Sequence, residues 1–301
     1  MKSKIIKVHV PATTANLGPG YDCLALTLDL WNHAVFTLEG KGINLKIKGE
    51  GSSKLVEDKR NLIAKSAIRF FEAFNFPEPL GLQIECDNNI PLGSGLGSSA
   101  AAVMTGLVGA NALLGNIASQ DDILELASRI EGHPDNVAAA LFGGLSIVIK
   151  EQTHLIHQHV SIKETLVSLA IPEFELPTLV SRAALPKAVP LADVVFNLGR
   201  TAMVVEALRN GNLDLLAYAM EDRLHQPYRL KLLPGAIYAM EAAKATGASA
   251  VALSGAGPSV IAFTAKDPQE VAISMVTAYE NAGIKARPMT LTTISQGAYI
   301  E

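Results

Sequence analysis

The chain has 301 residues, of which 49% are hydrophobic, so it can bury a substantial core in two domains or in one large α/β unit. Its 25 lysine and arginine residues are balanced by 29 aspartate and glutamate residues, and no dense basic cluster occurs. This charge pattern excludes nucleic acid and anionic membrane surfaces as expected partners and leaves small molecules as the expected ligands of a soluble globular protein.

The sequence predicts a cytoplasmic protein. Its first apolar stretch is interrupted by Lys7 and closed by Pro11, so the core of a signal peptide does not form. The apolar run 98–114 is rich in alanine and glycine and too short for a membrane span, so we expect a buried helix there. Cys23 and Cys86 lack neighbouring histidines or cysteines at metal-ligand spacing, and both are expected to be reduced thiols.

The first elements are predicted to be antiparallel strands. Residues 4–12 (KIIKVHVPA) alternate as an edge strand does, and residues 29–40 and 42–51 look like a hairpin that turns at the glycines between them.

The next segments alternate between helix and strand. Residues 61–75 carry apolar side chains at helical spacing, and residues 81–89 return to a strand that leads into a glycine-rich loop. Helices are expected over 98–114 and 121–130, the second with two aspartates in its first turn, and a strand near 143–151.

The second half of the chain reads as an α+β unit. The expected elements are a strand at 166–173, helices at 191–211 and 235–247, strands at 248–254 and 260–265, a helix at 268–283 and a strand at 285–292. We place the domain boundary between residues 150 and 165 and divide the chain into domains 1–155 and 156–301.

The glycine-rich loop IPLGSGLGSSAA, residues 90–101, lies between a predicted strand and a predicted helix. Glycines let backbone N–H groups approach a ligand, and the positive end of a helix dipole favours an anion such as phosphate. The loop has no lysine, which a P-loop requires, and Gly93, Gly95 and Gly97 have the spacing GxGxG instead of the dinucleotide fingerprint GxGxxG. Both common phosphate-loop motifs are therefore excluded.

Two other glycine-rich stretches flank this loop in the sequence. PATTANLGPGYD, residues 11–22, has the composition of a turn after a strand, and SGAGPS, residues 254–259, fits a tight hairpin between two apolar strands. Taken alone, neither would indicate a function.

Together, in this order and at these separations, the three stretches resemble the three motifs of the GHMP kinase family over nearly the whole chain. The resemblance implies a two-domain α+β fold, with an N-terminal ribosomal-protein-S5-like domain and a C-terminal ferredoxin-like α/β sandwich. Within that family, the combination with HPDN (133–136), the arginine before LP in VSRAALP (180–186), and HQPYR (225–229) before LPG implies L-homoserine as the phosphoryl acceptor.

The resemblance implies ATP and Mg²⁺ as ligands of the loop, whose backbone N–H groups and helix dipole would replace the missing lysine. It implies an ATP site at Asn61, Pro91, Leu92, Gly93, Ser94, Gly95, Leu96, Gly97, Ser98, Ser99, Ala100 and Ala101, and a third glycine motif at Ser254, Gly255, Ala256 and Gly257. Mg²⁺ prefers a few protein oxygens together with phosphate and water, and we assign Ser99 and Glu131 to it, with Glu125 as the alternative carboxylate.

The resemblance also implies an acceptor site. Its members in this chain are Asn16, Asp22, His133, Asn136, Arg182 and Arg229. The resemblance implies that the two arginines bind the acceptor's carboxylate, a planar anion that a guanidinium fits bidentately. Many members of the family have an aspartate base where this chain has Asn136, and an amide cannot take a proton. The implied route is positioning plus electrostatics, with the hydroxyl proton leaving late, to the γ-phosphate itself.

Two alternatives stay open at this point. One is another GHMP kinase, for mevalonate or a sugar, which the pair Arg182 and Arg229 argues against. The other is a nucleotide-binding protein without turnover, which the intact hydroxyl loop with Glu131 argues against. The resemblance also makes a homodimer the expected assembly.

Overall fold

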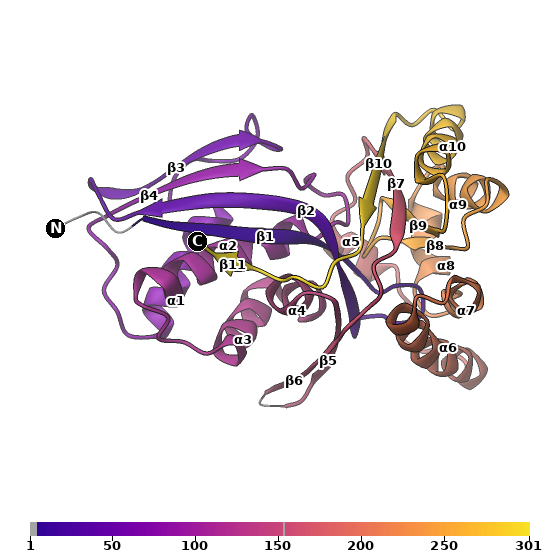
Figure 1. Ribbon diagram of the computed structural model, residues 1–301, viewed down its shortest axis with the longest axis horizontal. Helices are drawn as coiled ribbons and strands as arrows, with labels where there is room; N and C mark the ends of the chain where they lie inside the picture. Colours follow the sequence, from indigo (N-terminus) through magenta and orange to yellow (C-terminus); the bar gives the residue numbers. More distant parts are fainter. Residues whose placement is uncertain (1–4, 153) are drawn as a thin grey trace.

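The computed structural model describes residues 5–152 and 154–301, which form two units, each a β-sheet with helices packed against it (Figure 1). The first sheet has the strand order β11-β1-β2-β4-β3, and β5 extends it from β2 and carries β6. Its strands are β1 (Ile5–Ala15), β2 (Leu24–Thr37), β3 (Gly42–Gly49), β4 (Gly81–Asn88), β5 (Leu145–Lys150), β6 (Leu155–Val160) and β11 (Tyr299–Ile300).

The predicted hairpin between β2 and β3 is wrong. β4 lies between these two strands, antiparallel to β2 and parallel to β3. The chain leaves β3, crosses the face of the sheet as helix α1 (Leu62–Ala73), and returns as β4. The glycines between β2 and β3 fit a hairpin turn, but burial of the apolar face of α1 outweighs this local preference. The crossover through α1 buries that face, including Phe70 and Phe71.

Helix α2 (Ser98–Leu113) is the buried helix that the apolar run predicted. It packs between strand β1 and the helices α1, α3 (Gln120–Glu131) and α4 (Asp135–Phe142). A helix that is apolar on all sides is stable only when it is covered on all sides. Glycine permits the closest contact, because a Cβ at Gly106 would lie 2.3 Å from the carbonyl oxygen of Ile63.

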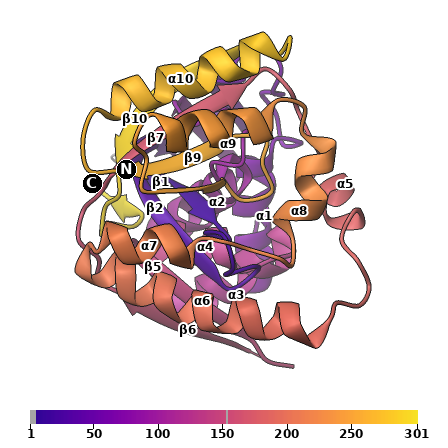
Figure 2. The same cartoon turned by 90° about the vertical axis from the view of Figure 1, so that its right-hand side faces the viewer.

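The second unit has a four-stranded antiparallel sheet of order β10-β7-β9-β8. In chain order this is the 4-1-3-2 arrangement of a ferredoxin-like unit, as expected from the sequence. Its strands are β7 (Leu166–Pro172), β8 (Ala250–Leu253), β9 (Val260–Thr264) and β10 (Ala286–Thr292). Helices α9 (Ala236–Ala245) and α10 (Pro268–Asn281) lie side by side on this sheet (Figure 2).

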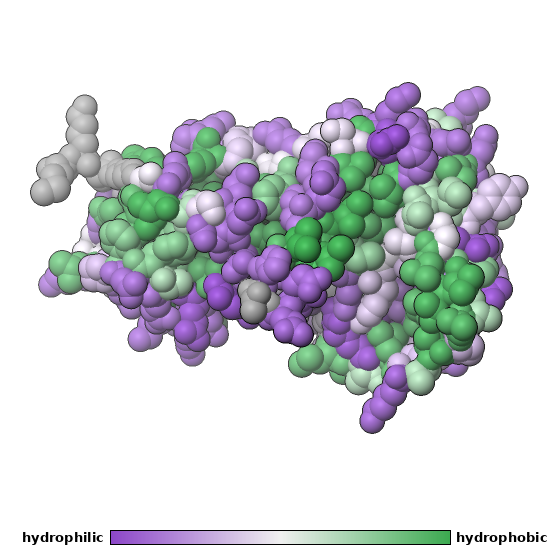
Figure 3. Space-filling model, turned by 90° about the horizontal axis from the view of Figure 1, so that it is seen from below, coloured by the Kyte–Doolittle hydropathy of each residue, from purple (hydrophilic) through white to green (hydrophobic). Residues whose placement is uncertain are grey.

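The remaining helices of this half are α5 (Thr178–Ala183), α6 (Leu191–Asn210), α7 (Leu213–Ala219) and α8 (Gln226–Arg229), the last followed by a 3₁₀ turn at Leu230–Leu232. Helix α6 leaves a row of apolar side chains exposed at helical spacing, Leu191, Val195 and Leu198. The face seen in Figure 3 has an apolar area at its right, the side on which α6 lies in Figure 1.

The chain passes from the first sheet to the second between β6 and β7. At its end it returns to the first sheet as β11, which lies beside β1. β11 was not predicted from the sequence. The division into domains 1–155 and 156–301 stays a prediction, and β6, which runs from Leu155 to Val160 in the first sheet, crosses that boundary.

Within the described ranges, no helix has both the length and the apolar composition needed to cross a bilayer. Cys23 and Cys86 are both free thiols, as expected. Burial raises the pKa of Cys23 to about 11, with the charges of Asp135 and Asp22 adding to the effect, so this thiol is protonated at neutral pH.

Candidate functional site

The three glycine-rich stretches, far apart in the sequence, meet where the two units join. The Ser254 hydroxyl donates to the Gly95 carbonyl at 2.8 Å, which connects the third stretch to the second. The Asn16 amide donates to the Gly255 carbonyl at 2.8 Å, and the Thr13 backbone N–H donates to the Leu96 carbonyl at 3.1 Å. The first stretch is therefore bonded to both of the others.

Gly95 shows how tightly this junction is packed, and it gives a stability prediction. Its φ is +81°, and a Cβ there would lie 2.2 Å from the Ser254 carbonyl oxygen. We expect Gly95→Ala to lower the free energy of unfolding by about 2 kcal/mol or more, the sum of a left-handed backbone penalty and a displaced loop. Urea unfolding measures this. Gly115→Ala is the matched control, because φ there is +86° and nothing lies within 4 Å of the added carbon. Equal losses in both variants would contradict the close packing.

A cavity of about 440 Å³ lies at this junction. It is lined by most of the residues expected to bind nucleotide, metal or acceptor: Asn16, Asp22, Asn61, Leu92, Gly93, Ser94, Gly95, Gly97, Ser98, Ser99, Glu131, His133, Asn136, Arg182, Arg229, Gly255, Ala256 and Gly257. The structure thus brings together side chains from both halves of the chain.

Some of the expected site residues do not line the cavity. Leu96, Ala100 and Ala101 are fully buried in the core behind the loop, and Ser254 is fully buried against Gly95. Pro91 faces a neighbouring depression. These five support the loop's shape, and any contribution they make to binding is through the backbone.

The loop ends at the N-terminus of helix α2. Gly97 occupies the N-cap position with φ +73°, so this helix has no capping side chain, and its first turn has no acidic residue. The backbone N–H groups at this end therefore have no intrahelical acceptor, and together with the helix dipole they favour an anion. In the described part of the chain the cavity lining contains no lysine, as expected from the loop sequence.

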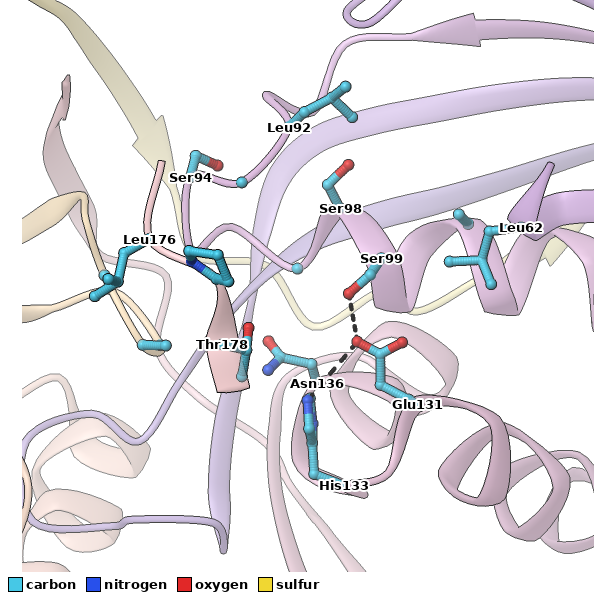
Figure 4. A pocket seen from close by; sticks show the side chains of 18 of the residues that line it. Leu62, Leu92, Ser94, Ser98, Ser99, Glu131, His133, Asn136, Leu176 and Thr178 are labelled. Carbon is cyan, nitrogen blue, oxygen red and sulfur yellow. Dashed lines mark hydrogen bonds and ion pairs between the residues drawn. The ribbon is translucent and has the colours of Figure 1, made fainter. Parts of the chain in front are cut away.

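One wall of the cavity carries the oxygen atoms suited to a divalent cation. The Ser99 hydroxyl, on the first turn of α2, donates to the Glu131 carboxylate at the end of α3 (Figure 4). The Glu131 side chain is only 8% exposed, and the His133 Nε2 atom lies 3.8 Å from its carboxylate. A hydroxyl and one carboxylate beside an anion site fit Mg²⁺, which keeps most of its ligands as water and phosphate oxygens. Glu125, the alternative carboxylate, does not line the cavity.

His133 and Asn136 lie beside this wall (Figure 4). The His133 Nδ1 atom lies 2.9 Å from the Asp135 carboxylate. Burial lowers the pKa of His133, but the hydrogen bond and charge of Asp135, together with Glu131, outweigh it and raise the pKa above its ordinary value. The Asn136 carbonyl oxygen accepts from the Thr13 hydroxyl at 2.7 Å, and its NH₂ group donates one hydrogen to the Asp135 carboxylate at 3.4 Å, which leaves the second N–H for a ligand in the cavity.

The two arginines occupy different electrostatic environments. Arg182, on α5, forms a bidentate pair with Asp22, with both N···O distances 2.7 Å, and it also donates to the Tyr21 hydroxyl at 2.9 Å. Both side chains of the ion pair are about one third exposed. Two expected acceptor-binding groups of opposite charge therefore neutralise each other in this structure.

Arg229, on α8, is 1% exposed. Across residues 5–152 and 154–301, no carboxylate lies within 4.0 Å of its guanidinium, and its Nε atom has no hydrogen-bond partner. It donates instead to the neutral His225 ring at 3.1 Å and the Gly255 carbonyl at 3.2 Å, and it lies over the Tyr21 ring at 5.2 Å. Burial lowers the pKa of Arg229. A buried cation without a counter-ion at the wall of a cavity is a site for an anion.

Sequence reasoning missed several polar side chains of the site, among them Asn32 and Asn88 in the cavity lining. Thr13 holds Asn136, Asp135 holds His133, and Thr178 lines the cavity from the start of α5. For Thr178 a signal was present: it precedes Arg182 by four residues, which places both on one face of a helix. For Thr13 the signal was its place in the first glycine-rich stretch.

Comparisons with known proteins agree with this geometry. The family model "GHMP kinases N terminal domain" matches residues 61–144, and "GHMP kinases C terminal" matches residues 204–281. A homoserine kinase from Parasynechococcus marenigrum is 44% identical over 300 residues, covering 98% of this chain and 95% of the relative. A homoserine kinase from Moorella thermoacetica is 41% identical over 294 residues, covering 97% of this chain and 99% of the relative.

Solved structures give the same result. The crystal structure of homoserine kinase from Cytophaga hutchinsonii superposes with a TM-score of 0.87 at 30% identity, covering 99% of this chain and 97% of that chain. The structure of L. major mevalonate kinase with R-mevalonate superposes with a TM-score of 0.68 at 14% identity, which shows the shared fold alone.

Proposed function

Because this chain belongs to the GHMP kinase family and groups within it with the homoserine kinases, we propose that it transfers the γ-phosphoryl group of ATP to the side-chain hydroxyl of L-homoserine. The product would be O-phospho-L-homoserine, an intermediate of threonine biosynthesis. The observation that carries the proposal is the buried, unpaired guanidinium of Arg229 in the same cavity as the Asp22–Arg182 ion pair. An amino acid presents the matching set of charges, a carboxylate and an ammonium group.

The cavity divides into regions that suit the two substrates. Leu55, Leu62 and Leu92 add apolar surface to the lining that suits the adenine ring, and the Asn61 side chain also lines the cavity. The glycine loop and the start of α2 suit the phosphates. The acceptor would lie between this loop and the arginines, with its carboxylate on Arg229 and Arg182 and its ammonium group on Asp22.

The proposed chemistry forms a bond between the acceptor's hydroxyl oxygen and the γ-phosphorus and breaks the bond from that phosphorus to the bridging oxygen of ADP. Mg²⁺, held by Ser99 and Glu131, would supply positive charge to the phosphates. Asn136 would orient the acceptor hydroxyl by donating its NH₂ group to the oxygen, and it has no capacity to take the proton. The proton would leave late, to the transferred phosphoryl group, and the chain's contribution is positioning and electrostatics.

A panel of acceptors tests the assignment. Steady-state rates with Mg-ATP should give a kcat/KM for L-homoserine far above those for mevalonate and galactose, because neither rival carries both the ammonium group and the carboxylate that this cavity matches. ADP formation coupled to a reporter reaction measures the rates. Faster turnover of mevalonate or galactose would overturn the substrate but not the family.

The cellular setting and assembly also belong to the proposal. We place the activity in the cytoplasm, where ATP and free amino acids are available, and we propose a homodimer. The exposed apolar row on α6 is a surface that a second copy could cover. Sedimentation velocity of the wild type tests this, since a monomer at micromolar concentration would contradict it.

A further inference from the structure

His225 is a fully buried histidine between Arg229 and the first glycine-rich stretch. Its Nε2 atom lies 2.7 Å from the Gly18 carbonyl oxygen, and its Nδ1 atom lies 3.1 Å from Nη1 of Arg229. A guanidinium has only donors, so Nδ1 must accept, and Nε2 must therefore carry the proton that is donated to Gly18. The two contacts together select the neutral ring with its proton on Nε2.

The charges around the ring keep it neutral. The nearest carboxylate is Asp222, whose Oδ2 lies 3.4 Å from Nε2. That carboxylate already accepts the backbone N–H groups of Leu224, His225 and Gln226 and the side-chain amide of Asn197. Burial lowers the pKa of His225 well below its ordinary value, against the opposing charge of Asp222. The imidazole is therefore uncharged at neutral pH, although a buried carboxylate is close.

A neutral acceptor has a specific consequence for Arg229. The histidine and the Gly255 carbonyl fix one nitrogen of the guanidinium without neutralising its charge. Arg182, in contrast, is held by a carboxylate, and its charge is already paired with Asp22. His225 thus orients the one arginine whose positive charge remains available to a ligand.

The same ring also fixes the first glycine-rich stretch. Gly18 follows Asn16 and Leu17, and all three have positive φ, of 71°, 69° and 43° respectively. A Cβ at Gly18 would lie 2.2 Å from the Met220 carbonyl oxygen, so this segment packs directly on the turn that leads to His225. The segment carries Asn16, which lines the cavity and bonds to Gly255.

We propose that His225 is a positioning residue for acceptor recognition. It holds Arg229 as an uncompensated cation and sets its distance from the loop that carries Asn16 and Asp22. This inference rests on the proposed function, because the anion that Arg229 receives is the carboxylate of the acceptor.

Two substitutions separate the two contacts of the ring. In His225→Asn the side-chain oxygen is near the place of Nδ1 and can accept from Arg229, but it does not reach Gly18. In His225→Gln the amide reaches the place of Nε2 and can donate to Gly18, but Arg229 loses the side-chain acceptor and keeps the Gly255 carbonyl. We expect His225→Gln to raise the KM for homoserine about tenfold or more and leave the KM for ATP within about twofold, whereas His225→Asn should stay closer to wild type. The preference for homoserine over 3-amino-1-propanol should fall in His225→Gln, which a purely structural role would not cause.

His159→Gln is the control, because that histidine also bonds to a backbone carbonyl, that of Gly143, but does not line the cavity. It should leave both KM values unchanged. Thermal unfolding of each variant shows whether it folds. Equal kinetics for His225→Asn and His225→Gln, or a ¹⁵N NMR spectrum of the wild type with the His225 proton on Nδ1, would overturn the positioning role. The NMR measurement needs no substrate. A wild type that is inactive on homoserine would overturn the proposed function instead, so the two failures are distinguishable.

Discussion

Replacing Arg229 by leucine is expected to cost about 2 to 5 kcal/mol in kcat/KM for homoserine, with ATP affinity close to wild type. The guanidinium is buried and, among the described residues, has no carboxylate within ion-pair distance, so leucine removes a charge that no protein carboxylate already neutralises. A buried charge built to meet an anion also rejects acceptors that lack it, by roughly 10⁴ to 10⁵. Wild-type kcat/KM for 3-amino-1-propanol should therefore be very low. Steady-state kinetics with both acceptors measure these effects.

Arg182→Leu and Arg69→Leu complete the series. Arg182→Leu should also lower kcat/KM for homoserine, by about 2 kcal/mol or more. It removes a proposed contact to the acceptor's carboxylate, and it leaves Asp22 without its ion-pair partner. Arg69 forms an exposed pair with Glu72 outside the cavity, and its replacement should change neither kinetic constant. If the wild type used the amino alcohol nearly as well as homoserine, or if both cavity variants matched wild type, the arginines would not read the acceptor's carboxylate.

Replacing Glu131 by alanine is the second large effect that we expect, a fall in kcat of roughly 10² or more. This carboxylate is almost fully buried and faces Ser99 at the start of α2, so its removal takes away the charged oxygen ligand that we assign to Mg²⁺. Ser99→Ala should act in the same direction. The Mg²⁺ concentration needed for half-maximal rate should rise in both variants, while ATP binding weakens less.

Glu125→Ala is the matched control for the metal site. Glu125 is on the same helix, α3, but does not line the cavity, so we expect kcat near wild type. Near-normal kcat in Glu131→Ala together with a large loss in Glu125→Ala would assign the metal to Glu125.

Much of the site could be predicted because its chemistry is concentrated in short sequence motifs. The sequence shows these motifs as glycine-rich loops and as short polar segments such as HPDN and HQPYR. They contain or adjoin the glycines, Ser99, Glu131 and both arginines. Gly95 and Gly97, for example, have positive φ, and an added Cβ would meet the Ser254 carbonyl oxygen at Gly95 and the Thr13 side chain at Gly97. Helix α2 was predictable because an apolar run without a polar face has to be buried.

Strand pairing was less predictable, since it depends on residues distant in sequence. The glycines between β2 and β3 fit a hairpin, yet β4 takes the place beside β2 because α1 needs the covering that the crossover provides. β11 is two residues long, which is too short for an alternating pattern to show.

The pairing of site residues with one another was equally hidden. Arg182 and Asp22 are 160 residues apart, and His225 and Gly18 are 207 residues apart. The motifs indicate that such residues belong to one site. They do not indicate that Asp22 forms an ion pair with Arg182, or that Arg229 donates a hydrogen bond to a neutral histidine.

The position of β11 affects the order in which the protein can complete its structure on the ribosome. β1 is the first strand to emerge. Its outer edge pairs with β11, so that Val8 lies opposite Ile300 and His9 opposite Tyr299 (Figure 1). During synthesis the helices of the first unit can already pack, but this edge stays open until the whole second unit has been made. An open edge exposes unpaired backbone N–H and C=O groups to other nascent chains. Translation stalled before residue 299 should therefore leave the first unit with an open β1 edge that the last strand covers in the finished protein.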